Sequence, residues 1–195
     1  MMTLSISKLE TNKDNLLMFS AKGEDYKFMN LLRRYIVTRV PVVAISQVTF
    51  YENSSSFFDE YISHRIGLIP LVTPAVVGEE AEIMFVLDER GPKNVYSENL
   101  KTNDPSIKVA VDQIPIVTLG EDQTIRAEAK GTLGTGQTHA KFQPGFATYE
   151  DKDNGEIIFR LESFHQIKPK DLLNRALDKI SRDISDLGKV LKKAK

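Results

Sequence analysis

The sequence predicts an α+β protein in which both ends of the chain build one domain and a β-rich domain is inserted between them. Three observations support this prediction. Apolar residues at helical spacing follow a short strand near the N-terminus, and a heptad repeat of aliphatic residues runs from Leu173 to Leu191. Between them, from about Thr73 to Tyr149, short β-like runs alternate with glycine, asparagine and aspartate. We expect a discontinuous domain of residues 1–50 and 150–195, and an inserted domain of residues 51–149.

The composition is that of an ordinary globular protein. Of the 195 residues, 41% are hydrophobic and 27% are charged, with 26 basic and 27 acidic side chains and no cysteine. These proportions exclude the disordered and collagen-like classes. Without cysteine the chain has no disulfide scaffold, thiol nucleophile, zinc ribbon or thiolate-bound iron–sulfur cluster.

The N-terminal residues and the charge distribution favour a soluble, cytoplasmic protein. Lys8, Glu10, Lys13 and Asp14 interrupt the apolar residues, unlike in a signal peptide. No apolar run approaches the length of about 18 residues that a membrane span needs. Residues 168–195 carry nine basic and four acidic side chains, a local charge of +5, so the rest of the chain carries −6. The near-zero total argues against a protein that mainly neutralises phosphates.

The first predicted elements are a strand at residues 15–22 and a helix that Asp25 can cap. Pro41 ends this helix near Arg39, because proline lacks an N–H group and makes the preceding residue extended. Arg33 and Arg34 lie on its polar face. Its apolar residues recur at positions i, i+3, i+4, i+7 and i+8, namely Phe28, Leu31, Leu32, Tyr35 and Ile36.

The middle of the chain predicts strands and one short helix. Residues 42–51 are rich in β-branched and aromatic side chains and predict a strand. Residues 53–56, Asn53 included, can supply caps for a second helix, and Ser56 with Asp59 matches a capping pattern. Gly67 ends this helix. Further strands are expected at residues 83–87, 107–111, 125–130 and 156–161.

The last predicted element is a long helix from Pro169 to about Lys192, because proline suits a first helical turn. This helix carries a heptad seam that either faces the core of its own domain or packs against a partner chain. From the residues alone we interpret the protein as a two-domain α+β protein with an assembly role. The heptad seam consists of Leu173, Leu177, Ile180, Ile184, Leu187 and Leu191.

The candidate catalytic and metal-binding residues have simpler structural explanations. His64, His139 and His165 are far apart, and none has a second histidine or cysteine at ligand spacing. Helix capping explains the serines at residues 54–56, and the adjacent carboxylates at residues 59–60 point to different faces. We expect no catalytic residue, no cofactor and no metal.

Two further patterns leave an alternative open. The glycine-rich segment at residues 131–136 (GTLGTG) lacks the G-K-[ST] ending of a phosphate-binding loop, which favours a tight surface turn over a nucleotide-binding enzyme. The helix dipole explains a cluster of terminal lysines, with weak nucleic-acid contact as the alternative. These lysines are Lys189, Lys192, Lys193 and Lys195.

Three segments resemble the α-like subunits of multisubunit RNA polymerases. Residues 28–36 (FMNLLRRYI) and 40–45 (VPVVAI) resemble the signature N-A-L-R-R-I…V-P-x-x-A-I. Residues 51–71, with NSS, DE and HRIGLIPL in order, resemble the block N-[ST]-S…D-E…H-R-[LI]-G-L-I-P-L. Residues 134–144 (GTGQTHAKFQP) are similar to the element G-x-G…H-A-K-[WF]-x-P of the archaeal D-type α-like subunits and their eukaryotic relatives. The resemblance covers essentially the whole chain.

The resemblance implies a dimerisation domain made from both termini, interrupted by an inserted β-rich domain. It implies that the first and last helices form the interface with the smaller α-like subunit, called subunit L in archaea. Small zinc-bearing subunits and the large catalytic subunits then dock on this heterodimer, with Arg34, and next Arg33, in contact with a large subunit. The implied interface residues are Phe28, Leu31, Leu32, Tyr35, Ile36, Leu173, Leu177, Ile180, Ile184, Leu187 and Leu191.

The sequence departs from this family in two respects. Many archaeal members carry a ferredoxin-like domain with an iron–sulfur cluster on cysteines, whereas this chain is short and has no cysteine. Residues 29–32 (MNLL) also replace the small alanine that is usual before the arginine pair. We therefore expect a non-catalytic assembly subunit of an archaeal DNA-directed RNA polymerase that acts in transcription, binds no cluster and reaches DNA only through the assembly. The alternative is a self-pairing α-like homodimer or a stand-alone protein-interaction module.

Overall fold

The computed structural model describes residues 5–11, 15–22, 26–78, 82–152 and 155–193. It confirms the predicted α+β class, and the described chain divides into two compact units. The first unit combines the residues up to Pro41 with those from Thr135 onward, and the second is Val42–Gly134. Both chain ends therefore build one unit, and the other unit is inserted between them.

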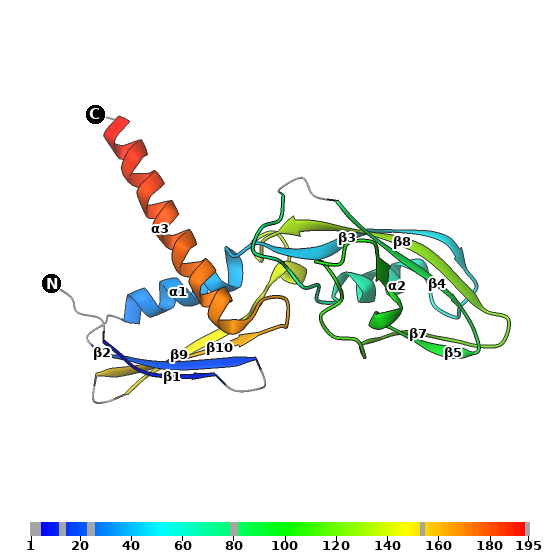
Figure 1. Ribbon diagram of the computed structural model, residues 1–195, viewed down its shortest axis with the longest axis horizontal. Helices are drawn as coiled ribbons and strands as arrows, with labels where there is room; N and C mark the ends of the chain where they lie inside the picture. Colours follow the sequence, from blue (N-terminus) through cyan, green and yellow to red (C-terminus); the bar gives the residue numbers. More distant parts are fainter. Residues whose placement is uncertain (1–4, 12–14, 23–25, 79–81, 153–154, 194–195) are drawn as a thin grey trace. The chain divides into compact units, whose positions relative to one another are not determined.

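The first unit is a four-stranded antiparallel sheet with two helices on one face (Figure 1). Its strands are ordered β1-β2-β10-β9, and the helices are α1 (Tyr26–Thr38) and α3 (Pro169–Lys193). The strands are β1 (Ser5–Thr11), β2 (Leu16–Lys22), β9 (Gly145–Asp151) and β10 (Glu156–Ser163), and a short helix η2 (Ala140–Phe142) precedes β9.

Alternation along β2 and β10 builds the core of this unit. Leu17, Phe19 and Ala21 are buried on β2, as the two-residue period of a strand requires. Phe19 lies opposite Phe159 in the sheet register, and the two rings stack with centroids 5.1 Å apart. The helices cover these residues with Met29, Leu32 and Ile36 from α1, and Leu172, Ala176 and Ile180 from α3.

The second unit contains a four-stranded antiparallel sheet of order β3-β8-β4-β6, a two-stranded sheet β5-β7 and the α-helix α2 (Asp59–Gly67). Ile62 and Ile66 of α2 join its hydrophobic core. The strands are β3 (Val42–Asn53), β4 (Ile83–Arg90), β5 (Lys93–Tyr96), β6 (Lys101–Thr102), β7 (Pro115–Leu119) and β8 (Thr124–Gly134), and a short helix η1 (Ser97–Asn99) follows β5.

The units begin and end at other residues than the expected boundaries near 50 and 150. Strand β3 pairs with β8 from Val42 to Asn53, so the whole strand belongs to the inserted unit. Strand β9 pairs with β10 along its length and therefore belongs to the unit built from the chain ends. Hydrogen bonding between strands distant in sequence sets these limits, and local composition does not reveal it.

The structure confirms the strand expected at residues 15–22, both long helices and the strands at 42–51, 83–87, 125–130 and 156–161, with shifted ends. Strand β1 was not predicted. The strand expected at residues 107–111 is wrong, since only Val109 forms an isolated bridge, with Leu71. The turn expected at residues 131–136 is also wrong for Gly131 to Gly134, which continue β8.

The helix caps differ from the predicted ones. The expected cap Asp25 lies outside the described residues. Helix α2 begins after Phe58, whose side chain makes no capping hydrogen bond, so the predicted Ser56 cap is wrong. Instead, the Nδ2 atom of Asn53 donates to the Phe57 carbonyl at 2.9 Å and to the Asp59 carboxylate at 2.7 Å. A side chain at the end of β3 therefore organises the start of α2.

Candidate assembly surface

Helix α1 buries one face and exposes another. Met29, Leu32 and Ile36 recur at intervals of three and four residues and are buried in the first unit. Leu31 lies on the outer side and is 38% exposed. The helix ends where Thr38 Oγ1 donates to the Arg34 carbonyl at 2.7 Å and the Arg39 N–H donates to the Tyr35 carbonyl at 2.8 Å. One apolar edge of α1 is thus left for other contacts.

Helix α3 has two halves with different surroundings. Its first half packs on the sheet and α1 through Leu172, Ala176 and Ile180, which are buried. Beyond Ile180 no described residue of α3 is buried, and in Figure 1 the red end of the helix extends away from the sheet. This half nevertheless carries four apolar side chains that are 58–62% exposed. We call Ile184, Leu187, Val190 and Leu191 the distal stripe.

A polar contact joins α1 to α3 at the point where burial ends. The Tyr35 hydroxyl donates to the Asp183 carboxylate at 3.2 Å, and Lys179 Nζ donates to the same carboxylate at 2.8 Å. Together with the charge of Arg39, these donors hold the pKa of Asp183 below its usual value, the Lys179 hydrogen bond contributing most. The contact therefore lies between Ile180, the last buried residue of α3 among those described, and Ile184, the first residue of the distal stripe.

The predicted interface residues fall into three groups. Leu32, Ile36 and Ile180 are buried within the chain itself, where they hold the helices to the sheet. Phe28, Tyr35 and Leu173 are half-buried. Leu31, Leu177, Ile184, Leu187 and Leu191 are exposed. The heptad seam therefore does not coincide with the buried face of α3, because Ile180 is the one seam residue that is buried among those described, and Leu172 and Ala176, which pack in the core, lie outside the seam.

Val190 belongs to the exposed apolar surface but is absent from the heptad seam. Val190 follows Leu187 by three residues and immediately precedes Leu191, so its side chain adjoins theirs on the apolar side of the helix. A wheel with 3.6 residues per turn, applied without the strict heptad, includes Val190 in the apolar face. That broader period was the signal that sequence reasoning missed.

Arg33 and Arg34, the two arginines expected to contact a large subunit, differ in exposure and in hydrogen bonding. Arg33 is half-buried, and its Nε and NH2 atoms donate to the Asn30 Oδ1 atom at 3.3 and 2.9 Å. Arg34 is exposed, and no described residue accepts a hydrogen bond from its guanidinium. Arg34 is therefore the arginine that is available to an external carboxylate or carbonyl.

The side chains in the sequence block at residues 51–71 make hydrogen bonds and packing contacts within the second unit. The Asn53 carboxamide oxygen accepts hydrogen bonds from the Ser55 N–H at 3.1 Å and the Ser55 hydroxyl at 2.6 Å. The Arg65 guanidinium donates to the Pro115 carbonyl and lies 5.9 Å from the Tyr61 ring centre. These residues join α2 to β3 and β7, so their identity is explained by folding.

The glycine-rich segment and the residues after it also have structural roles. A Cβ atom on Gly136 would lie 2.1 Å from the Val37 carbonyl oxygen, so only glycine fits beside the end of α1. The His139 Nδ1 atom accepts a hydrogen bond from the Lys141 N–H at 3.1 Å and caps η2. Lys141 Nζ lies 5.3 Å from the Phe142 ring centre, and burial lowers the pKa of this lysine. This close packing argues against a phosphate-binding loop.

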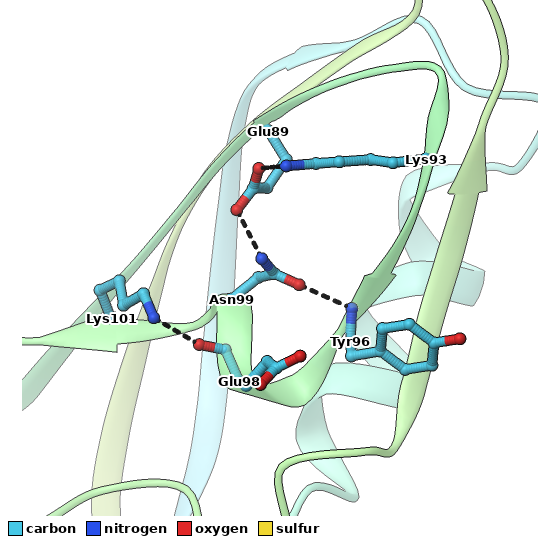
Figure 2. A network of polar contacts seen from close by, with 6 residues as sticks. All are labelled: Glu89, Lys93, Tyr96, Glu98, Asn99 and Lys101. Carbon is cyan, nitrogen blue, oxygen red and sulfur yellow. Dashed lines mark hydrogen bonds and ion pairs between the residues drawn. The ribbon is translucent and has the colours of Figure 1, made fainter.

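A polar network ties the turns of the second unit together (Figure 2). Glu89 accepts a hydrogen bond from Asn99 Nδ2 at 2.7 Å and pairs with Lys93, while Asn99 Oδ1 accepts from the Tyr96 N–H at 2.8 Å. Lys101 Nζ donates to the Glu98 carbonyl at 2.8 Å. Both carboxylate oxygens of Glu89 and both polar atoms of the Asn99 carboxamide thus have partners, and this network stabilises the fold around η1.

The described residues hold no group of three or more histidine, aspartate or glutamate side chains that could bind a metal ion. The sequence contains no cysteine, so it supplies no thiolate for an iron–sulfur cluster. Within the described part of the chain, no helix is both long enough and apolar enough to span a membrane. The feature that stands out is the exposed apolar surface of α3.

Comparison with known proteins identifies the family. Residues 43–150 match the family described as the RNA polymerase Rpb3/RpoA insert domain. The chain is 39% identical over 170 residues to DNA-directed RNA polymerase subunit Rpo3 of Methanocaldococcus jannaschii, with 87% of each chain covered. It is 41% identical over 154 residues to Rpo3 of Pyrococcus furiosus, covering 75% of this chain and 59% of the relative.

A third relative, Rpo3 of Halobacterium salinarum, is 42% identical over 120 residues, which cover 62% of this chain and 48% of the relative. The chain thus spans about half to three fifths of the length of some relatives and most of the length of another. These matches confirm the resemblance to α-like polymerase subunits that the three sequence segments indicated. The chain belongs to the family of archaeal DNA-directed RNA polymerase subunit Rpo3, the D-type member of the α-like group.

Proposed function

We propose that this chain is a non-catalytic assembly subunit of an archaeal RNA polymerase and that it pairs with the smaller α-like subunit L through α3 and the outer edge of α1. The observation that carries the proposal is the distal stripe. Four neighbouring aliphatic side chains on one exposed helix face are uncommon on a monomer surface and are typical of a protein interface.

The energetics favour burial of this stripe by a partner. Complete burial of an aliphatic side chain contributes about 1.5–3 kcal/mol, and these side chains are more than half exposed. Each of the four would therefore gain roughly 1 kcal/mol on association. Leu177 and Leu31, each 38% exposed, extend the same apolar surface toward the domain.

In this proposal, the buried members of the predicted interface do not contact the partner but hold the two helices in place. Leu32, Ile36 and Ile180 hold α1 and α3 on the sheet, and so position the exposed residues. Arg34, and next Arg33, would pair with carboxylates of a large subunit, since a guanidinium forms bidentate hydrogen bonds. The small zinc-bearing subunits and the catalytic subunits would dock on the heterodimer, and nucleotidyl transfer would belong to those large subunits.

The proposal is tested by co-expression of the tagged chain with subunit L from the same genome. Ile184→Asp should abolish recovery of subunit L, because a buried unpaired carboxylate costs several kcal/mol. Leu177→Asp should have the same effect. Ser185→Asp, which places the same charge on the neighbouring exposed residue outside the stripe, is the control and should recover subunit L as the wild type does. Equal recovery with Ile184→Asp would show that the stripe is not the interface.

The second candidate function is self-pairing, as in an α-like homodimer or a stand-alone interaction module. The distal stripe also favours it, since any apolar helix face can pair with its own copy. Light scattering of the purified chain with and without subunit L separates the two candidates. A stable homodimer that does not respond to subunit L would support self-pairing and exclude the heterodimer.

A further inference from the structure

Gly188 lies in the interior of α3, where no feature of the described chain requires glycine. Glycine is among the poorest helix-forming residues, so its presence there destabilises the helix relative to alanine. A Cβ atom on Gly188 would meet no atom within 4 Å, and its backbone does not adopt the left-handed conformation. Neither a close neighbour within this chain nor a turn accounts for the residue.

The position of Gly188 places it within the apolar surface of α3. It follows Ile184 by four residues and precedes Leu191 by three, so the three residues are neighbours on one helix face. Leu187, which precedes Gly188 in sequence and so points about 100° away from it, is 58% exposed and lies on the adjoining part of the apolar surface. Gly188 therefore forms a gap between exposed aliphatic side chains, where an external backbone or bulky side chain can approach the helix axis.

Beside the distal stripe, within the described part of the chain, the acidic side chains are in ion pairs, whereas three of the basic side chains are not. Asp183 pairs with Lys179 and Asp186 pairs with Lys189, each at 2.8 Å. Arg182, Lys192 and Lys193 have no ion-pair partner among the described residues. Lys192 follows Gly188 by four residues and so borders the gap. Lys193, the next residue, points about 100° further round the helix, so the two lysines flank the apolar surface on different sides. The surface is thus apolar with uncompensated positive charge at its edges.

We propose that the distal half of α3 binds an amphipathic helix of an unlike chain, whose apolar face packs closely against Gly188 and whose adjacent carboxylates pair with Lys192 and Lys193. This inference rests on the proposed function and adds the chemistry of the partner surface. Carboxylates on the partner would compensate the positive edges, and opposite charges beside an apolar helix seam select partners.

The same charges disfavour a second copy of this chain as the occupant. Parallel pairing would bring Lys192 and Lys193 of both copies together, and like charges in contact are destabilising. Antiparallel pairing would place them beside the region of Lys179 and Asp183, where the carboxylate is already paired. An unlike chain with free carboxylates satisfies the positive edges in either direction.

The close approach is tested with Gly188→Ala in the full chain, with subunit L from the same genome as the probe. Ser185→Ala is the matched control, because it also raises helix propensity but lies outside the stripe. Both variants should increase the helix signal in circular dichroism. Ser185→Ala should keep the Kd for subunit L within about twofold, whereas Gly188→Ala should raise it about tenfold or more, since an added methyl group overpacks the contact.

Wild-type or tighter binding by Gly188→Ala would overturn the inference. If Ile184→Asp abolishes binding while Gly188→Ala binds normally, the proposed function stands and only the close approach fails. If Ile184→Asp itself binds normally, the proposed function fails as well. The two failures are therefore distinguishable.

The carboxylate edge is tested by the salt dependence of binding. Raising NaCl from about 50 to 500 mM should weaken the wild-type complex about fivefold or more, because exposed ion pairs are screened. The double variant Lys192→Gln and Lys193→Gln should bind more weakly at low salt and lose most of this dependence. A wild-type complex that is insensitive to salt, or a tight homodimer of the chain alone in sedimentation, would overturn the charge assignment.

Discussion

The Tyr35 hydroxyl and the Asp183 carboxylate meet at 3.2 Å and join the two helices of the first unit. The contact lies one turn beyond Ile180, the last buried residue of α3 among those described. From this point onward α3 makes an exposed apolar surface. The pair therefore marks the boundary between the part of α3 that stabilises the domain and the part that is available to a partner.

Asp183→Asn should lower the melting temperature near neutral pH and have progressively less effect in acid. The native pKa of Asp183 is lowered, chiefly by the Lys179 hydrogen bond, so the ionised carboxylate stabilises the fold above its unfolded pKa of about 4. This contribution is lost as the pH falls through the lowered pKa. Thermal unfolding from pH 7 to pH 2 measures the difference. A wild-type advantage that persists undiminished at pH 2 would contradict the assignment, and Tyr35→Phe serves as a milder companion that removes one donor.

Ile180→Ala and Ile184→Ala should differ in how much they lower the free energy of unfolding, because one residue is buried and the other is exposed on the same helix. Ile180 is buried, so its truncation should lower the free energy of unfolding by about 2–5 kcal/mol. Ile184 is 62% exposed, and its truncation should change that free energy by less than about 0.5 kcal/mol. Urea unfolding of the isolated chain checks both values. Equal losses would mean that the distal half of α3 packs within the chain.

Amide hydrogen exchange should divide α3 into a protected and a poorly protected half. A free helical segment shorter than about 12–15 residues is marginally stable in water, and residues 181–193 lack buried side chains. We expect fast exchange there in the isolated chain and slow exchange near Leu172 and Ala176. Addition of subunit L should slow the distal exchange. Strong distal protection without any partner would contradict this expectation.

Gly136→Ala should destabilise the first unit, whereas Gly188→Ala should stabilise it. A Cβ atom at Gly136 would overlap the Val37 carbonyl oxygen, and such overpacking costs about 1–3 kcal/mol. Gly188 has open space around it, and alanine there should add about 1 kcal/mol of helix stability. Thermal unfolding of the two variants gives the comparison. Equal stability of Gly136→Ala and the wild type would disprove the close approach.

Asn53→Ala should destabilise the second unit, and Ser56→Ala should not. The Asn53 carboxamide donates to Phe57 and Asp59 and accepts from Ser55, and because water can replace Asn53 at the exposed Phe57 and Asp59, the loss should be about 0.5–1.5 kcal/mol. Ser56 is exposed and does not cap α2. Chemical unfolding of both variants tests this reversal of the capping pattern. A larger loss with Ser56→Ala would restore the capping role predicted from the sequence.

The long periodic elements were predictable because local periodicity shows which residues share one face of a helix or strand. The apolar spacing in α1 and α3 and the alternation in β8 and β10 all correspond to observed elements. The sequence segments that resemble α-like polymerase subunits also pointed to the family that the comparisons show. The strand predicted at residues 107–111 is wrong because an apolar run forms a strand only where a partner strand lies alongside it. Here Val109 forms a single bridge with Leu71.

The sequence by itself determined the α+β class, the two amphipathic helices and the absence of cysteine chemistry, since each follows from residue type and spacing along the chain. Only the tertiary structure decided which residues of α3 are buried, because the helix packs in the first unit through Leu172, Ala176 and Ile180, whereas the seam residues Leu177, Ile184, Leu187 and Leu191 are exposed. Burial depends on which distant strands and helices lie alongside a residue. A helical repeat describes one face of a helix, and the rest of the fold decides what covers that face.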